Sequence, residues 1–198
     1  MIFNHLYSVG LLCLIFSKEE VQMSVDDYLV SGRSCNECNA CCTCLRIEKP
    51  ELTKKADVPC PHLSQHRGCA IYEGRPDVCR TWYCGWRVMP FIREDMRPDR
   101  SKVLIKQDET GFVFQPLKPE YVNNLTHENV LEAIGALVSS NIEVKTSIPT
   151  RPGYCHVLLV LNDRIKPAVD KLDLHAARQV MRSAIFYSRH SQTRPEPD

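Results

Sequence analysis

The sequence predicts an α+β fold, in which a loop-rich cysteine-cluster module is packed on a small sheet with helices. Nine of the eleven cysteines lie between Cys35 and Cys84, and after Ser101 the chain alternates between strand-like and helix-like patterns of apolar residues. With 198 residues, of which 43% are hydrophobic, the chain can bury a core without disulfide staples. The clustered cysteines therefore need another explanation.

Residues 1–22 are expected to be a translated leader or, failing that, a weak signal-like segment. The apolar run at 6–16 follows no Lys or Arg and precedes no small-residue cleavage site, so it is a poor signal peptide. It is also shorter than the about 20 residues that span a bilayer. Lys18, Glu19 and Glu20 can be encoded as AAG-GAG-GAA, a bacterial ribosome-binding sequence ahead of Met23. We therefore expect Met23 to be the true start.

Residues 23–100 are predicted to form a cysteine-rich metal-binding module. Prolines and glycines recur between its cysteines and leave little room for long helices or strands. A segment so rich in loops must be held together by something other than a large apolar core.

Residues 101–187 are predicted to form an α+β body, and its strands are indicated first. The runs at 102–107 and 112–115 alternate, and the polar turn at 108–111 makes them a hairpin. Two more strands are expected at 142–148 and 155–161. The last is almost continuously apolar, which predicts burial on both faces.

Two helices complete the predicted body. Residues 126–140 place apolar side chains on one face, with Thr126 as the expected N-cap. Asp173 is expected to cap a second helix that carries an apolar stripe, and the polar residues 188–198 are expected to form a disordered tail.

The cysteine spacing is the strongest chemical indication. Cys35, Cys38 and Cys41 are each separated by two residues, and Cys42 follows directly. Two cysteines at this spacing can turn both sulfurs toward one metal ion. The same spacing opens the iron–sulfur run of bacterial ferredoxins, in which a more distant ligand precedes a proline, as Cys60 does here.

Three explanations compete for these cysteines. Disulfides need an oxidising compartment, for which the chain carries no convincing export signal, and eleven is an odd number. Buried small hydrophobic side chains would not be so regularly spaced. Metal binding explains the spacing best, and arginines in or beside the module could offset thiolate charge: Arg46, Arg67, Arg75, Arg80 and Arg87.

The ordered motifs resemble the YkgJ-type cysteine-cluster family, also known as the CxxCxxCC or zinc- or iron-chelating domain. They are C-x2-C-x2-C-C at 35–42, C-P-H-L at 60–63, G-C-A-I-Y at 68–72 and R-P-D-V-C-R at 75–80. The resemblance covers residues 34–83 and implies metal binding through Cys35, Cys38, Cys41, Cys42, Cys60, Cys69 and Cys79. Flagellin lysine methylases resemble this family in their cluster region, which implies an iron–sulfur centre as an alternative to zinc.

The expected function is therefore binding of zinc or iron, with a [4Fe–4S] cluster as one form of the centre. Cys84, which follows the matched motifs, joins the candidate ligands, so the full set is Cys35, Cys38, Cys41, Cys42, Cys60, Cys69, Cys79 and Cys84. Two other functions remain open: an iron–sulfur-dependent redox or protein-modifying enzyme, and a disulfide-bonded envelope protein.

The charge balance bears on partners. The chain has 25 Lys and Arg against 24 Asp and Glu, a formal net charge of +1. No bulk positive field favours nucleic acid or an anionic membrane surface. We expect a cytoplasmic protein whose partners are a metal ion and another protein, with no nucleic acid and no membrane.

Overall fold

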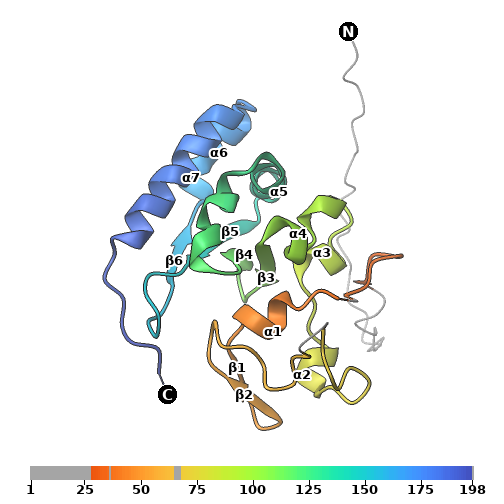
Figure 1. Cartoon of the computed structure of the whole chain (residues 1–198). Coiled ribbons are helices and arrows are strands. Elements are labelled where there is room, and N and C mark those ends of the chain that lie inside the picture. Colours follow the sequence, from red (N-terminus) through yellow and green to blue (C-terminus); the bar gives the residue numbers. More distant parts are fainter. Residues whose placement is uncertain (1–27, 36, 65–67, 198) are drawn as a thin grey trace, which may run out of the picture.

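The computed structural model describes residues 28–35, 37–64 and 68–197. It confirms the predicted α+β class, with one two-stranded and one four-stranded sheet (Figure 1). The expected leader at residues 1–22 lies outside the described residues. In the ranges described, no helix has both the length and the apolar character needed to cross a membrane.

The four-stranded sheet is the centre of the body. Its order is β3 (Val103–Gln107), β4 (Gly111–Pro116), β5 (Glu143–Ile148) and β6 (Val157–Val160). The β3–β4 and β5–β6 pairs are antiparallel, whereas β4 and β5 run parallel. All four strands fall within or close to the ranges that the sequence predicts, and the β3–β4 hairpin is confirmed.

Three helices pack against this sheet through β5 and β6 (Figure 1). They are α5 (Glu128–Ser139), α6 (Asn162–Asp170) and α7 (Leu174–Arg189). Helix α7 buries Met181, Ala184 and Ile185 in the core. The Asp173 side chain accepts a hydrogen bond from the backbone N–H of Ala176 at 2.9 Å, which confirms it as the N-cap.

The start of α5 differs from the prediction. A 3-10 helix, η3 (Pro119–Thr126), ends at Thr126, and His127 occupies the N-cap position of α5. The Thr126 hydroxyl donates back to the carbonyl of Asn123 at 2.8 Å, within the last turn of η3. Because His127 and not Thr126 occupies the N-cap position, α5 begins without a side-chain cap.

The expectation that the last strand is buried on both faces is wrong. β6 is an edge strand, and its side chains alternate between half-buried and exposed. Leu158 and Val160 are 55% and 46% exposed. Helix α7 contacts β6, so the apolar run combines one covered face with one open face.

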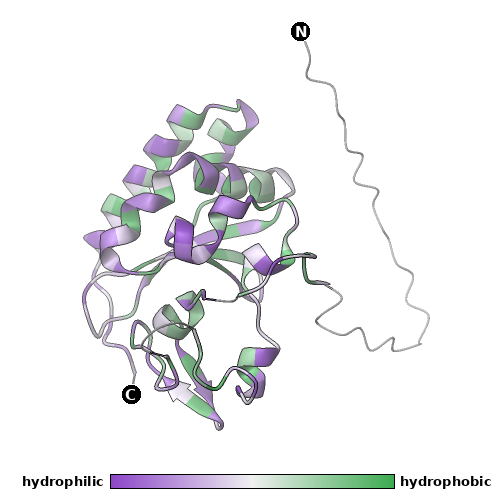
Figure 2. Ribbon diagram, turned by 45° about the vertical axis from the view of Figure 1, so that its right-hand side comes forward, coloured by the Kyte–Doolittle hydropathy of each residue, from purple (hydrophilic) through white to green (hydrophobic). Residues whose placement is uncertain are grey.

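The cysteine module consists of short elements below the sheet in Figure 1. They are α1 (Ala40–Cys44), β1 (Ile47–Lys49), β2 (Leu52–Lys54), α2 (Asp77–Arg80), α3 (Gly85–Val88), η2 (Glu94–Met96) and α4 (Pro98–Ser101). Figure 2 shows apolar and polar residues intermixed along these short pieces, unlike the broader apolar faces of the helices above. The predicted boundary at residues 100–101 falls inside α4, so the two parts are joined by a helical turn.

The chain before α1 is anchored by Arg33. Its guanidinium donates to the carbonyls of Trp86, Met89 and Ile92 and lies over the Trp86 ring, 5.2 Å from the centroid. One cation thereby ties the segment before α1 to carbonyls of α3 and of the loop that follows it.

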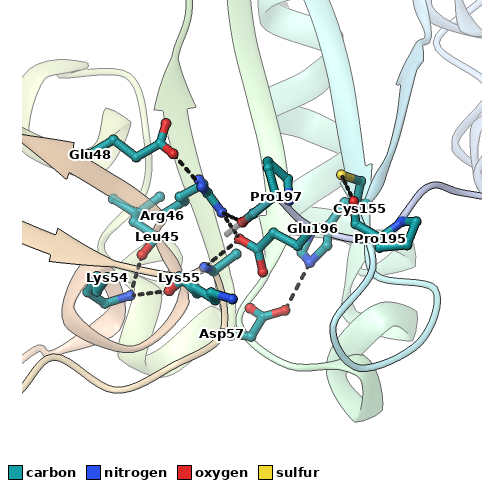
Figure 3. A network of polar contacts seen from close by, with 12 residues as sticks. Leu45, Arg46, Glu48, Lys54, Lys55, Asp57, Cys155, Pro195, Glu196 and Pro197 are labelled. Atoms are coloured by element: carbon teal, nitrogen blue, oxygen red, sulfur yellow. Dashed lines mark hydrogen bonds and ion pairs between the residues drawn. The ribbon is translucent and has the colours of Figure 1, made fainter.

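The C-terminal residues, expected to be disordered, have defined contacts instead (Figure 3). The backbone N–H of Cys155 donates to the carbonyl of Arg194 at 3.0 Å, and that of Glu196 donates to the carbonyl of Gly153 at 2.9 Å. The Glu196 carboxylate accepts from Arg46 at 2.8 Å and from the backbone N–H of Ala56 at 2.9 Å. Residues 194–197, the C-terminal strap, therefore connect the body to the cysteine module.

Candidate metal centre

The eight candidate cysteines line a single cavity of about 370 Å³ in the cysteine module. The chain brings them there from six separate places: Cys35, Cys38, Cys41 with Cys42, Cys60 with Cys69, Cys79, and Cys84. Positions that are 49 residues apart in sequence thus face one space. The sequence spacing alone could join only the first four.

Backbone hydrogen bonds position the first group. The N–H of Cys38 donates to the carbonyl of Cys35 at 2.7 Å and closes a tight turn. Cys41 and Cys42 follow in α1, and the Cys42 carbonyl accepts from the N–H of Cys60 at 2.8 Å. This last bond ties α1 to the loop after β2, which places Cys60 beside the C-x2-C run.

The remaining cysteines come from turns and helix ends. Cys69 pairs with Leu63 in an isolated antiparallel bridge. Cys79 lies in α2, where its N–H donates to the carbonyl of Pro76 at 2.9 Å. Cys84 is the N-cap residue of α3. Because α1, α2 and the start of α3 each contribute one or two sulfurs, the fold of the module and the shape of the cavity depend on each other.

For four of these thiols, Cys38, Cys41, Cys79 and Cys84, a raised pKa favours the neutral form. Burial raises the pKa of Cys38 and of Cys79, and it raises the pKa of Cys84 to about 11. For Cys79, the charges of Cys42, Cys60 and Cys69 act in the same direction. The thiols thus oppose one another's ionisation, and a bound cation would reverse that effect, because a coordinating thiol loses its proton.

Cys42 behaves differently from its neighbour. A hydrogen bond from the Cys41 thiol lowers the pKa of Cys42, burial opposes this, and the Lys54 ammonium lowers it further. The same hydrogen bond, together with burial, raises the pKa of Cys41. Cys42 is therefore the thiol of this pair that ionises first.

Cationic side chains stand close to the sulfurs. Arg75 lines the cavity, stacks on the Tyr72 ring 4.1 Å from its centroid, and lowers the pKa of Cys79 by its charge. Its Nε is buried without a hydrogen-bond partner in the described part of the chain. Lys106 also lines the cavity, and burial lowers its pKa. These charges suit a group that carries net negative charge, as a metal with several thiolates does.

Three of the arginines proposed from the sequence have other partners. Arg46 lines the cavity but pairs with Glu48 and Glu196, and Arg80 pairs with Asp77. Arg87 is buried against the Tyr83 ring, 5.5 Å from its centroid. Arg67 lies outside the described residues. The sequence analysis does not single out Lys54 or Lys106, yet the Lys54 charge lowers the pKa of Cys42, and both lysines act in this direction on Cys44.

Cys44 is not part of the cavity lining. It is 1% exposed, its carbonyl accepts from the N–H of Asp57 at 3.3 Å, and burial raises its pKa to about 12. It packs in the core between module and sheet, like other buried free cysteines. Cys44 is thus a structural residue, although it lies only two positions from Cys42.

The lining sulfurs are spread around the cavity and do not converge on one metal position. Among the residues that the structure describes, no three His, Cys, Asp or Glu side chains stand close enough together to hold a metal ion. All ten described cysteines are free thiols. The donor chemistry fits zinc or an iron–sulfur cluster, but the surrounding loops would have to contract around either.

The chain matches no protein-family model, no curated protein and no solved structure. The functional argument therefore rests on the cavity and its residues.

Proposed function

We propose that this protein binds zinc or iron through the cysteine cluster, as a member of the YkgJ-type cysteine-cluster family. The observation that supports the proposal is the convergence of eight cysteines, from six places in the chain, on one cavity. Cysteines that only fill a core would not share a cavity with Arg75 and Lys106. The ligands would come from Cys35, Cys38, Cys41, Cys42, Cys60, Cys69, Cys79 and Cys84.

The surroundings suit a centre that is shielded from water. Trp82, Tyr83 and Tyr72 line the cavity together with aliphatic side chains such as Leu104. Zinc bound here by four thiolates would stabilise the module, and a [4Fe–4S] cluster would supply one-electron redox chemistry. This chain's own part is to hold the sulfurs, to keep water out and to balance their charge with Arg75, Lys54 and Lys106.

We further propose that the protein works in the cytoplasm and that the metal-bound module presents a surface to a protein partner. Free thiols in large number suit a reducing compartment. The loop-rich module and its dependence on a metal suit a recognition element rather than a rigid catalytic scaffold. Nucleic acid remains an unexpected partner, given a net charge of +1.

The test is the metal and acid-labile sulfide content of protein purified without oxygen. We compare the wild type with Cys38→Ser, which removes a lining thiol, and with Cys44→Ala, which removes the buried thiol outside the cavity. The wild type and Cys44→Ala should carry the same metal per chain, and Cys38→Ser should carry less. Iron with matching sulfide identifies a cluster, and zinc without sulfide identifies a structural site.

Hydrogen exchange on the same three proteins separates metal loss from misfolding. In Cys38→Ser, the segment 34–88 should exchange faster, while α7 around Met181 stays protected, because Met181 is fully buried in the body. Wild-type protein that holds neither zinc nor iron, with its cysteines paired after denaturation, would contradict the proposal and favour a disulfide-bonded protein.

A further inference from the structure

A second cavity, of about 440 Å³, lies along α7 and contains no cysteine. Its other walls come from Asn123 in η3 and from Thr150, just after β5. Because β4 and β5 are parallel, the segments that follow their C-terminal ends leave the sheet at the same edge. In open sheets with parallel strands, ligands bind at this edge.

The cavity is cationic. Arg182 and Arg189 line it and carry its positive charge, and none of its lining residues is acidic. Neither arginine forms an ion pair or hydrogen bond within the described parts of the chain. Two guanidinium groups on the same wall, without carboxylates to neutralise them, attract an anion.

The position of these cations in α7 is informative. A helix C-terminus favours cations, which accounts for Arg189 but not for Arg182, which lies two turns before the end. Arg178, one turn earlier still, donates to the carbonyl of Thr126 at 3.0 Å and supports the fold. Arg182 makes no such contact with the residues that the structure describes.

An apolar surface lies between the two arginines. Ile185 is buried, whereas Phe186 is 67% exposed. The Phe186 ring lies against the His190 ring, with centroids 4.3 Å apart. His190 donates through Nδ1 to the Phe186 carbonyl at 2.7 Å, which leaves Nε2 as the ring nitrogen open to a ligand.

We propose that this cavity binds a small organic phosphate, with its phosphate between Arg182 and Arg189 and an aromatic body on Phe186 and Ile185. A phosphate dianion matches two guanidinium forks, each of which offers paired donors. The Asn123 amide and the Thr150 hydroxyl add neutral donors at the rim. An apolar patch with a few convergent polar groups is the common composition of small-molecule sites.

The experiment is an NMR titration of the full chain, uniformly labelled with nitrogen-15, with phenyl phosphate. Inorganic phosphate and phenol are titrated in parallel. The first tests the phosphate group without the ring, and the second tests the ring without the phosphate group. Phenyl phosphate should bind more tightly than either and should shift the amides of Arg182, Ile185 and Phe186. Arg182→Ala and Arg189→Ala should each weaken binding about tenfold.

Two further variants make the test specific. Arg164→Ala removes an exposed arginine on α6, outside the cavity, and should leave the affinity unchanged. Phe186→Ala should weaken phenyl phosphate without affecting inorganic phosphate. Failure of phenyl phosphate to bind, equal affinity for phenyl and inorganic phosphate, or equal weakening by Arg164→Ala would each overturn the proposal. None of these measurements depends on whether the cysteine cluster holds a metal, so this proposal and the proposed function can fail separately.

Discussion

Asp108 closes the hairpin between β3 and β4 and also reaches the neighbouring strand. Its Oδ1 accepts from the backbone N–H groups of Thr110 and Gly111, at 3.1 and 3.0 Å, and its Oδ2 accepts from Lys145 on β5 at 2.8 Å. Burial alone would raise the pKa of Asp108, but these hydrogen bonds outweigh it and lower the pKa to about 2. One side chain therefore joins three strands.

This lowered pKa predicts a pH-dependent contribution to stability. A carboxyl whose pKa lies below its ordinary value of 3.8 stabilises the fold above that value and loses the contribution as the pH falls toward 2. Since the side chain is about a third exposed, Asp108→Asn should cost only about 1 kcal/mol at neutral pH. In urea denaturation the difference from the wild type should shrink between about pH 4 and pH 2.

The exposed neighbour Glu109 provides the control for this prediction. Glu109→Gln alters a charge in the same loop without touching the network, and it should change stability little at any pH. A cost for Asp108→Asn that stayed constant down to about pH 2 would contradict the ionic origin of the effect.

At the level of single residues, the sequence indicated the cysteines that line the cavity but not Lys106, which lines it with them. The C-x2-C spacing is a local property, and the matched motifs carried the more distant cysteines. Lys106 lies on β3 two positions from Leu104, and both face the cavity. Nothing in the local sequence distinguishes this lysine from a solvent-facing one, because its environment is created by tertiary packing.

Gly111 permits the close pairing of β4 with β5. A Cβ at this position would lie 2.0 Å from the carbonyl oxygen of Glu143, its register partner across the parallel pair. Backbone cannot move aside as a flexible side chain can. Gly111→Ala should therefore destabilise the fold by about 1 to 3 kcal/mol, measured as a shift in the urea unfolding midpoint.

Gly135 in α5 is the matched control. There a Cβ would meet only Val169 methyl groups, at 3.8 and 4.0 Å, which is ordinary contact. Gly135→Ala should stabilise the protein by about 0.5 to 1 kcal/mol, because alanine favours a helix. Equal effects of the two substitutions would show that steric contact with β5 is not what Gly111 avoids.

The elements with long, regular patterns were predicted and the ambiguous ones were not. The apolar stripe and Asp173 located α7, because both signals are local. β6 was misjudged, since four apolar residues look the same in a central strand and in an edge strand with one covered face. α6 was not predicted, and Pro167 within it is a residue that normally argues against a helix.

Across the whole molecule, the C-terminal strap connects the body to the segment of the cysteine module around β1 and β2. Glu196 has partners in both parts of the chain, and a second contact, between His156 and Asp57 at 2.9 Å, lies in the same interface (Figure 3). A polar tail after a helix is normally unstructured. Its order here depends on partners about 140 residues away, which no local pattern in the sequence reveals.

The strap makes the cysteine module depend on Glu196. Glu196→Ala removes one of the two carboxylates that Arg46 contacts and the acceptor of the Ala56 N–H, and hydrogen exchange at residues 46–57 should become roughly tenfold faster. Glu196→Gln keeps an acceptor oxygen and should have a smaller effect. If exchange accelerated equally in α7, the change would be a global loss of stability, and the strap would have no local role.

The strap also sets an order of events during synthesis. Arg46 and Ala56 leave the ribosome long before Glu196, since chains emerge from the N-terminus. The module cannot reach its strapped form until residues 194–197 have been synthesised. Zinc or iron that arrived before the strap was made would therefore meet an open set of thiols, whereas metal that arrived later would have to enter a module already fastened by the strap.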